Sequence, residues 1–123
     1  MPLDVLIVDD SAAIRKILQR VLRQTDLPLG QIWEASDGLE GMRMLAENSV
    51  GLIFSDINMP TMNGIEMLAS IKGNAALKTI PIIMITTEGS QEKVMQALKL
   101  GASGYVRKPF TPDQIKDKLA GLV

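Results

Sequence analysis

Three aspartates follow apolar runs that are typical of buried strands. Asp9 and Asp10 come directly after the run 5–8, and Asp56 follows the run 52–54 and Ser55. If these runs are neighbouring parallel strands, their carboxyl ends meet at one edge of a sheet and the carboxylates crowd together. Such like charges repel by a few kcal/mol at an effective dielectric near ~20, so the cluster indicates a bound cation. Oxygen ligands with room for water suit Mg²⁺.

Two more strand ends add groups that could bind phosphoryl oxygens. Thr86 and Thr87 follow the run 82–85, and Lys108 and Pro109 follow the run 105–106. A carboxylate can act as the nucleophile in phosphoryl transfer, while a metal ion, a hydroxyl and an ammonium group stabilise the phosphoryl charge. Each residue alone is more simply structural, because Asp and Thr favour strand ends and helix caps. Together at successive strand ends they predict a phosphoryl-transfer site.

The composition of the 123-residue chain excludes most other kinds of site. It has no histidine and no cysteine, so His-dependent triads, thiolate catalysis and thiolate metal sites are absent. A net charge of -1 and few aromatic residues (Phe 2, Tyr 1, Trp 1) argue against binding to nucleic acid or an anionic membrane. The run 5–8 is too short for a signal peptide or a membrane span. We therefore expect a cytoplasmic protein that binds neither nucleic acid nor a membrane.

The elements that must position these residues alternate along the chain. Strand-like apolar runs occupy 5–8, 32–33, 52–54, 82–85 and 105–106. Helical spacing of apolar residues separates or follows them, with stripes at Ile14, Ile17, Leu18, Val21 and Leu22, at Val94, Ala97 and Leu98, and at Ile115, Leu119 and Leu122. This alternation predicts a single α/β domain over 1–123. Its fold is a (βα)5 doubly wound parallel sheet of flavodoxin-like type, for which the order 2-1-3-4-5 is common.

Capping residues mark where several helices begin. Asp37 and Asn63 each stand three residues before a glutamate, the spacing of a capping box. Thr111 and Pro112 are typical of a cap followed by a first-turn proline, and they predict the start of the last helix.

The combination of strand-end motifs resembles the response-regulator receiver domain of two-component signalling. The resemblance covers essentially the whole chain, and it is of the type found in single-domain chemotaxis regulators. It rests on the acidic pair 9–10, the segment 56–64 (DINMPTMNG), the threonines 86–87 and the segment 108–110 (KPF). Asn63 departs from the aspartate that many relatives have before the glycine, but asparagine caps a helix equally well.

The resemblance implies a role for each site residue. Asp56 is the expected phosphoacceptor, and Asp9, Asp10 and the backbone carbonyl of Asn58 hold Mg²⁺ with it. Thr86 and Lys108 are expected to bind phosphoryl oxygens. The donor is expected to be a phosphohistidine on a sensor kinase or phosphotransfer protein. The chain is not expected to be an enzyme that turns over external substrates.

Further expectations concern docking, lifetime and output. Ala13, Ile14 and Pro109 are expected to form the rim where the donor docks, with Ile14 equally explicable as ordinary core. Asn58 and Glu88 are expected to flank the water that hydrolyses the acyl phosphate within seconds to minutes. Tyr105 is expected to respond to Thr86 and alter the face of the fourth helix, fifth strand and fifth helix. That face includes Lys93, Gln96 and Lys116. It would bind a downstream effector, for which the flagellar motor switch is one candidate.

Two alternatives belong to other classes. A flavodoxin-like electron carrier on the same sheet would need a hydroxyl-rich phosphate loop after the first strand, where this chain has Asp9 and Asp10. A scaffold that is never phosphorylated would leave the matching strand ends unexplained.

Overall fold

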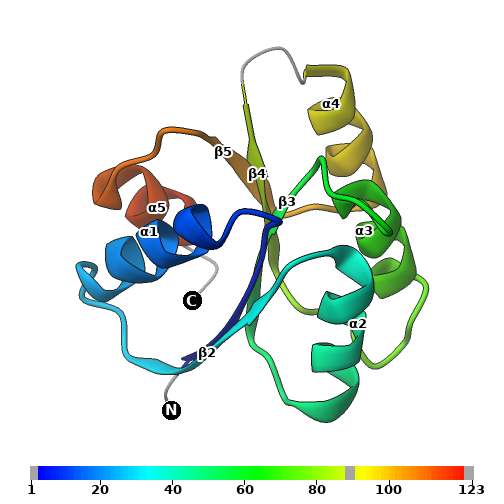
Figure 1. Cartoon of the computed structure of the whole chain (residues 1–123), viewed down its shortest axis with the longest axis horizontal. Helices are drawn as coiled ribbons and strands as arrows, with labels where there is room; N and C mark the ends of the chain where they lie inside the picture. Colours follow the sequence, from blue (N-terminus) through cyan, green and yellow to red (C-terminus); the bar gives the residue numbers. More distant parts are fainter. Residues whose placement is uncertain (1–2, 88–90, 121–123) are drawn as a thin grey trace.

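The computed structural model describes residues 3–87 and 91–120, in which five strands alternate with five helices (Figure 1). The strands are β1 (Leu3–Val8), β2 (Leu29–Ala35), β3 (Leu52–Asp56), β4 (Ile82–Thr86) and β5 (Gly104–Arg107). The helices are α1 (Ala12–Arg23), α2 (Gly38–Glu47), α3 (Gly64–Lys72), α4 (Gln91–Leu100) and α5 (Pro112–Leu119). All pairings are parallel, in the order β2-β1-β3-β4-β5, which confirms the predicted fold and strand order. No helix in the described part of the chain is long and apolar enough to cross a membrane.

The sheet separates two apolar layers. Successive side chains of a strand point to opposite faces, so Leu6 and Ile53 face the layer under α2, α3 and α4, while Ile7 and Phe54 face the layer under α1 and α5 (Figure 1). Every residue of β3 and β4 is buried, as expected for strands covered on both faces. Burial of the central strands fixes the position of their carboxyl ends, where the polar residues begin.

Two predicted apolar stripes are wider than the buried faces of their helices. Ile17 is 45% exposed and Leu98 is 38% exposed. In α1 the buried residues are Leu18, Val21 and Leu22, because the helix contacts the sheet along a narrower line than the periodicity predicts. The expected core residue Leu122 lies outside the described residues.

Helix starts agree with most of the predicted caps. Asn63 and Thr111 each form a complete capping box, in which the side chains of the cap and of the third helical residue bind each other's backbone N–H. Asp37 accepts a hydrogen bond from the Glu40 N–H, but the carboxylate of Glu40 accepts from the Ser36 hydroxyl instead of closing the box. The α3 cap matters for function, because α3 begins directly after the loop that follows Asp56.

Candidate functional site

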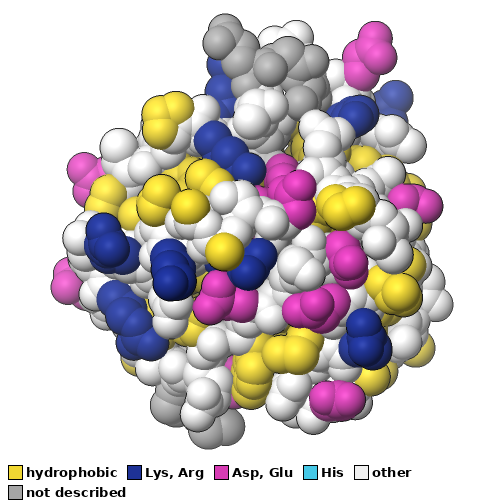
Figure 2. Space-filling view, in the orientation of Figure 1, with side chains coloured by type: hydrophobic (Ala, Val, Ile, Leu, Met, Phe, Trp, Pro, Cys, Tyr) yellow, Lys and Arg dark blue, Asp and Glu magenta, His cyan; other side chains and the backbone are white. Residues whose placement is uncertain are grey.

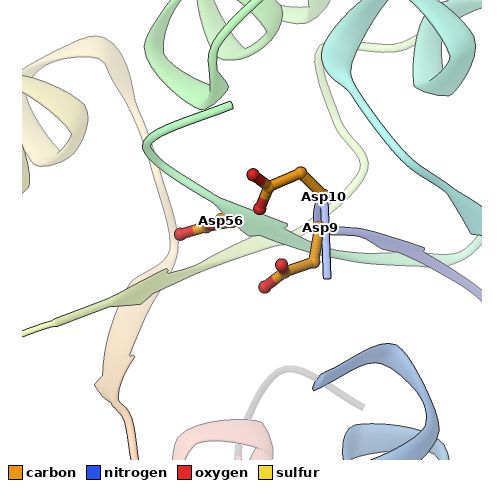
Figure 3. A group of neighbouring side chains, drawn as sticks. All are labelled: Asp9, Asp10 and Asp56. Carbon is orange, nitrogen blue, oxygen red and sulfur yellow. The ribbon is translucent and has the colours of Figure 1, made fainter. Parts of the chain in front are cut away.

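The carboxyl ends of β1 and β3 bring three aspartates together. The pairing of Val8 with Ser55 places the residue after β1 level with the last residue of β3. One carboxylate oxygen from each of Asp9, Asp10 and Asp56 lies within 4.8 Å of the others. Figure 3 shows these side chains leaving the two strand ends at the same edge of the sheet. On the face of the molecule drawn in Figure 2, acidic side chains lie near the middle. The structure thus groups the aspartates that the sequence analysis singled out.

Burial differs among these aspartates. Asp9 is fully buried, Asp56 is 7% exposed and Asp10 is exposed. Oδ1 of Asp9 accepts a hydrogen bond of 2.9 Å from the Ser11 N–H, and Oδ1 of Asp56 accepts one of 2.8 Å from the Ile57 N–H. Each buried carboxylate therefore has one oxygen held by backbone and a second oxygen free to face the cluster.

Lys108 supplies positive charge to the cluster. Its Nζ lies 2.9 Å from Oδ2 of Asp9 and 3.6 Å from Oδ2 of Asp56. Lys108 is therefore shared between the two buried carboxylates and lies closer to Asp9. A single ammonium group against three carboxylates leaves net negative charge in the site.

The environment of Asp56 disfavours its ionised form. Burial is the largest cause that raises the pKa of this carboxyl above its ordinary value of 3.8, and the charge of Asp9 raises it further. The charge of Lys108 and the Ile57 N–H lower the pKa without cancelling the increase, while Asp10 adds a small increase. A cation placed among these oxygens would favour the ionised form of Asp56 and so lower its pKa.

The donor set fits a small, hard divalent cation. All candidate ligand atoms in the acidic cluster are carboxylate oxygens, and one of the three aspartates is solvent-exposed. Mg²⁺ is usually held by one or two carboxylates and keeps several waters. The exposed side of the cluster leaves access for such waters and for a phosphoryl group.

The loop after Asp56 is fixed by the start of α3. The Gly64 N–H donates a hydrogen bond of 2.8 Å to the carbonyl of Ile57. A Cβ at position 64 would collide with the carbonyl oxygen of Asp56, so glycine is required for this close approach. The Asn63 capping box holds the same turn. Asparagine here does the structural work of a cap, as the sequence predicted.

Thr86 and Tyr105 line one pocket between the sheet and α4. Thr86 is buried at the end of β4, and its hydroxyl donates a hydrogen bond of 3.1 Å to the carbonyl of Thr87. Both Thr86 and Tyr105 line a pocket of about 240 Å³ against α4, whose apolar lining includes Met95 and Leu98. This position explains the exposure of Leu98, because it faces the pocket rather than the sheet.

Tyr105 is half-buried on β5 beneath a lysine from α5. It pairs with Met84 of β4, and the Nζ of Lys118 lies 5.2 Å from the centre of its ring. The ring therefore lies between the pocket against α4 and the surface of α5.

The residues expected to dock a donor lie around the start of α1 and the end of β5. Ala13 and Pro109 are exposed, and Ile14 is half-buried. The peptide bond between Lys108 and Pro109 is cis. Partial exposure leaves Ile14 available to a partner and also in contact with the fold.

Of the two residues expected to flank the hydrolytic water, the structure describes Asn58 but not Glu88. Asn58 is exposed, and its Oδ1 accepts a hydrogen bond from the Nζ of Lys93 in α4. Glu88 lies outside the described residues.

Arg15 is a site residue that sequence reasoning missed. Its guanidinium donates to the backbone carbonyl of Asp9 and forms an ion pair of 3.0 Å with Glu34 of β2. These contacts anchor the end of β1 to the neighbouring strand. No local signal could have identified the pair, because the partners are separated by 19 positions in the sequence.

Comparison with known families identifies this arrangement. The response regulator receiver domain family matches residues 5–120. The chain belongs to this family. This receiver domain is 40% identical to the chemotaxis protein CheY-3 of Vibrio cholerae over 94% of the chain and 87% of the relative. It is 41% identical to the CheY homolog of Campylobacter jejuni over 93% of the chain and 87% of that protein.

Solved structures agree with the sequence comparisons. The chemotaxis response regulator CheY4 of Vibrio cholerae has a TM-score of 0.87 and 33% identity, with full coverage of both chains. A response regulator from Chloroflexus aurantiacus has a TM-score of 0.89 at 25% identity, covering 99% of this receiver domain and 98% of that chain. The chain is therefore a phosphorylation-regulated signalling module rather than a metabolic enzyme. This result decides against the electron-carrier alternative.

Proposed function

We propose that this receiver domain accepts a phosphoryl group from a phosphohistidine of a sensor kinase or phosphotransfer protein onto Asp56. An oxygen of Asp56 forms the new bond to phosphorus as the bond from phosphorus to the histidine nitrogen breaks, and the electron pair stays on that nitrogen. The observation that carries the proposal is the meeting of three carboxylates and Lys108 at one sheet edge. Carboxylate oxygens alone repel a phosphoryl group, so the cluster serves transfer only when a cation offsets their charge.

Asp9, Asp10, Asp56 and the backbone carbonyl of Asn58 would hold Mg²⁺ in this proposal. The metal supplies charge neutralisation for the phosphoryl oxygens. Lys108 lies close enough to the Asp56 carboxylate to bind one of those oxygens, at 3.6 Å from Oδ2. Thr86 lies one residue beyond the partner of Asp56 in the β3–β4 register, which makes its hydroxyl the candidate for a second oxygen.

The output is a change at the face formed by α4, β5 and α5. Thr86 and Tyr105 line the same pocket, so a Thr86 hydroxyl drawn to the phosphoryl group changes the space open to the tyrosine ring. We assign this face to a downstream effector. In the named relatives the process is chemotaxis, and we propose the same process here, in the cytoplasm, with the flagellar motor switch as one candidate effector.

Signal termination is proposed to be intrinsic. Water attacks phosphorus, the bond to Asp56 breaks, and the carboxylate keeps the electron pair while inorganic phosphate leaves. Asn58 stands two residues after Asp56, and Glu88 stands two residues after Thr86, as side chains that could flank this water.

Metal-dependent labelling by a small phosphodonor tests the proposed function. Incubation with acetyl phosphate and Mg²⁺ should add the mass of one phosphoryl group to the intact protein, and a chelator should prevent the addition. Undiminished labelling in the chelator, or no labelling under either condition, would contradict the proposal. The second result would favour a scaffold that is never phosphorylated.

A further inference from the structure

Lys93 reaches from α4 to the loop that follows Asp56. Its Nζ donates a hydrogen bond to Oδ1 of Asn58, across 35 positions of sequence. Lys93 also lines a pocket of about 240 Å³ together with Ile57, Ile65 and Glu66. The side chain therefore spans the groove between the start of α3 and α4, and it ends on the residue two positions after Asp56.

The hydrogen bond fixes the orientation of the Asn58 amide. An asparagine side chain presents an acceptor oxygen at one end and an NH₂ donor at the other. With the oxygen turned to Lys93, the NH₂ group is the end directed away from α4. Of these two groups, only the amide oxygen can accept a hydrogen bond from a water that attacks phosphorus. An amide held in this orientation is therefore poorly placed to assist hydrolysis.

We propose that Lys93 is a positioning residue that orients the Asn58 amide and thereby prolongs the lifetime of the phosphoryl group on Asp56. This inference rests on the proposed function, because it concerns hydrolysis of the acyl phosphate. In that reaction the water oxygen bonds to phosphorus, the bond from phosphorus to Asp56 breaks, and the protons of the water pass to the released phosphate and to solvent. Lys93 acts on this step through Asn58, without contact with the reacting atoms.

A double-mutant cycle tests the proposal. Each protein is labelled with acetyl phosphate and Mg²⁺, the donor is removed, and loss of the phosphoryl mass is followed over time. Lys93→Met should speed the loss by about fivefold, the ratio expected for one hydrogen bond of ordinary net strength. In the Asn58→Ala background, which keeps the backbone carbonyl, Lys93→Met should leave the rate unchanged.

Two further variants separate orientation from charge. Lys93→Arg retains a donor and should restore a rate close to that of the parent. Lys99→Met removes another exposed charge from α4 and should not change the rate. Equal acceleration by Lys93→Met in both backgrounds would overturn the proposal in favour of a direct charge effect, and no acceleration in the parent background would also overturn it. A parent protein that takes up no phosphoryl group would contradict the proposed function, and this inference with it.

Discussion

At the scale of single residues, the carboxylates at the ends of β1 and β3 carry more negative charge than their neighbours balance. Lys108 is the cation within ion-pair distance of Asp9 and Asp56 in the described residues, and Asp10 adds a third negative charge. The folded protein without metal therefore holds these groups at a cost in free energy. A bound cation removes that cost and stabilises the fold by mass action.

Asp10→Ala should separate the repulsion from the metal affinity. Without metal, its melting temperature should equal or exceed that of the parent, because one repelling charge is gone. Addition of Mg²⁺ should raise the melting temperature of the variant by clearly less than that of the parent. Asp117→Ala, which removes an exposed acid of α5, should respond to Mg²⁺ like the parent. An undiminished Mg²⁺ response in Asp10→Ala would show that this residue is not a ligand.

The raised pKa of Asp56 gives the metal-free protein a defined pH dependence. Between the ordinary value of 3.8 and the higher folded value, the folded state holds a proton that the unfolded chain has released. The free energy of unfolding should therefore fall as pH rises through this window and level off above it. Denaturant titrations in a chelator should show the stability of Asp56→Asn relative to the parent growing from about pH 3.8 upward. A difference that does not vary with pH would contradict this environment for Asp56.

At the scale of elements, part of the apolar side of α1 is buried against the domain and part of it is exposed to solvent. Ile14 is half-buried and Ile17 is 45% exposed, one turn apart near the start of the helix. Ala13 is exposed on the same helix. This partly exposed apolar strip suits the proposed contact with a donor protein that carries a phosphohistidine.

Ile14→Lys tests whether this strip docks the donor. Transfer from a phosphorylated histidine phosphotransfer domain that labels the parent should become slower, because a lysine disrupts the apolar contact. Labelling by acetyl phosphate should be retained, since that donor needs no docking surface. Leu39→Lys, at a 45% exposed leucine of α2 outside this strip, serves as the control for both assays. Equal loss in the two assays would identify Ile14 as a core residue.

Elements differ in how well the sequence could predict them. β3 and β4 could be located because continuous apolar runs are typical of strands buried on both faces. The exposure of Ile17 and Leu98 could not be predicted, because a helical repeat gives the direction of an apolar face but not the width of the contact that the face makes. The contacts of Lys93 with Asn58 and of Arg15 with Glu34 join distant positions, so they depend on packing that no local pattern encodes.

At the scale of the whole molecule, the proposed function requires phosphorylation at one sheet edge to change a surface that a partner can bind. Thr86 and Tyr105 line one pocket between the sheet and α4, and Lys118 of α5 lies over the tyrosine ring. A ring with an apolar body and a polar tip is stable both in a pocket and at the surface. If the phosphorylated site favours one of these two ring positions by a few kcal/mol, the population of that position rises substantially.

The single tyrosine allows the proposed switch to be tested directly. With fluorotyrosine incorporated, Tyr105 should give one ¹⁹F resonance, and beryllofluoride with Mg²⁺, a mimic of the acyl phosphate, should shift it. Thr86→Ala should still take up a phosphoryl group from acetyl phosphate, because Asp56 and the acidic pair are intact. Its tyrosine resonance should not respond to beryllofluoride. A full response in Thr86→Ala would place the switch outside the Thr86 and Tyr105 pair.

The most direct test of the central claim is to locate the phosphoryl group. After reaction with acetyl phosphate and Mg²⁺, peptide mapping by mass spectrometry should find one added phosphoryl group, on the peptide that contains Asp56. Asp56→Asn should gain no phosphoryl mass under the same conditions. Metal-dependent labelling of Asp56→Asn at the level of the parent, or a label mapped to another peptide, would contradict the assignment of Asp56 as the phosphoacceptor.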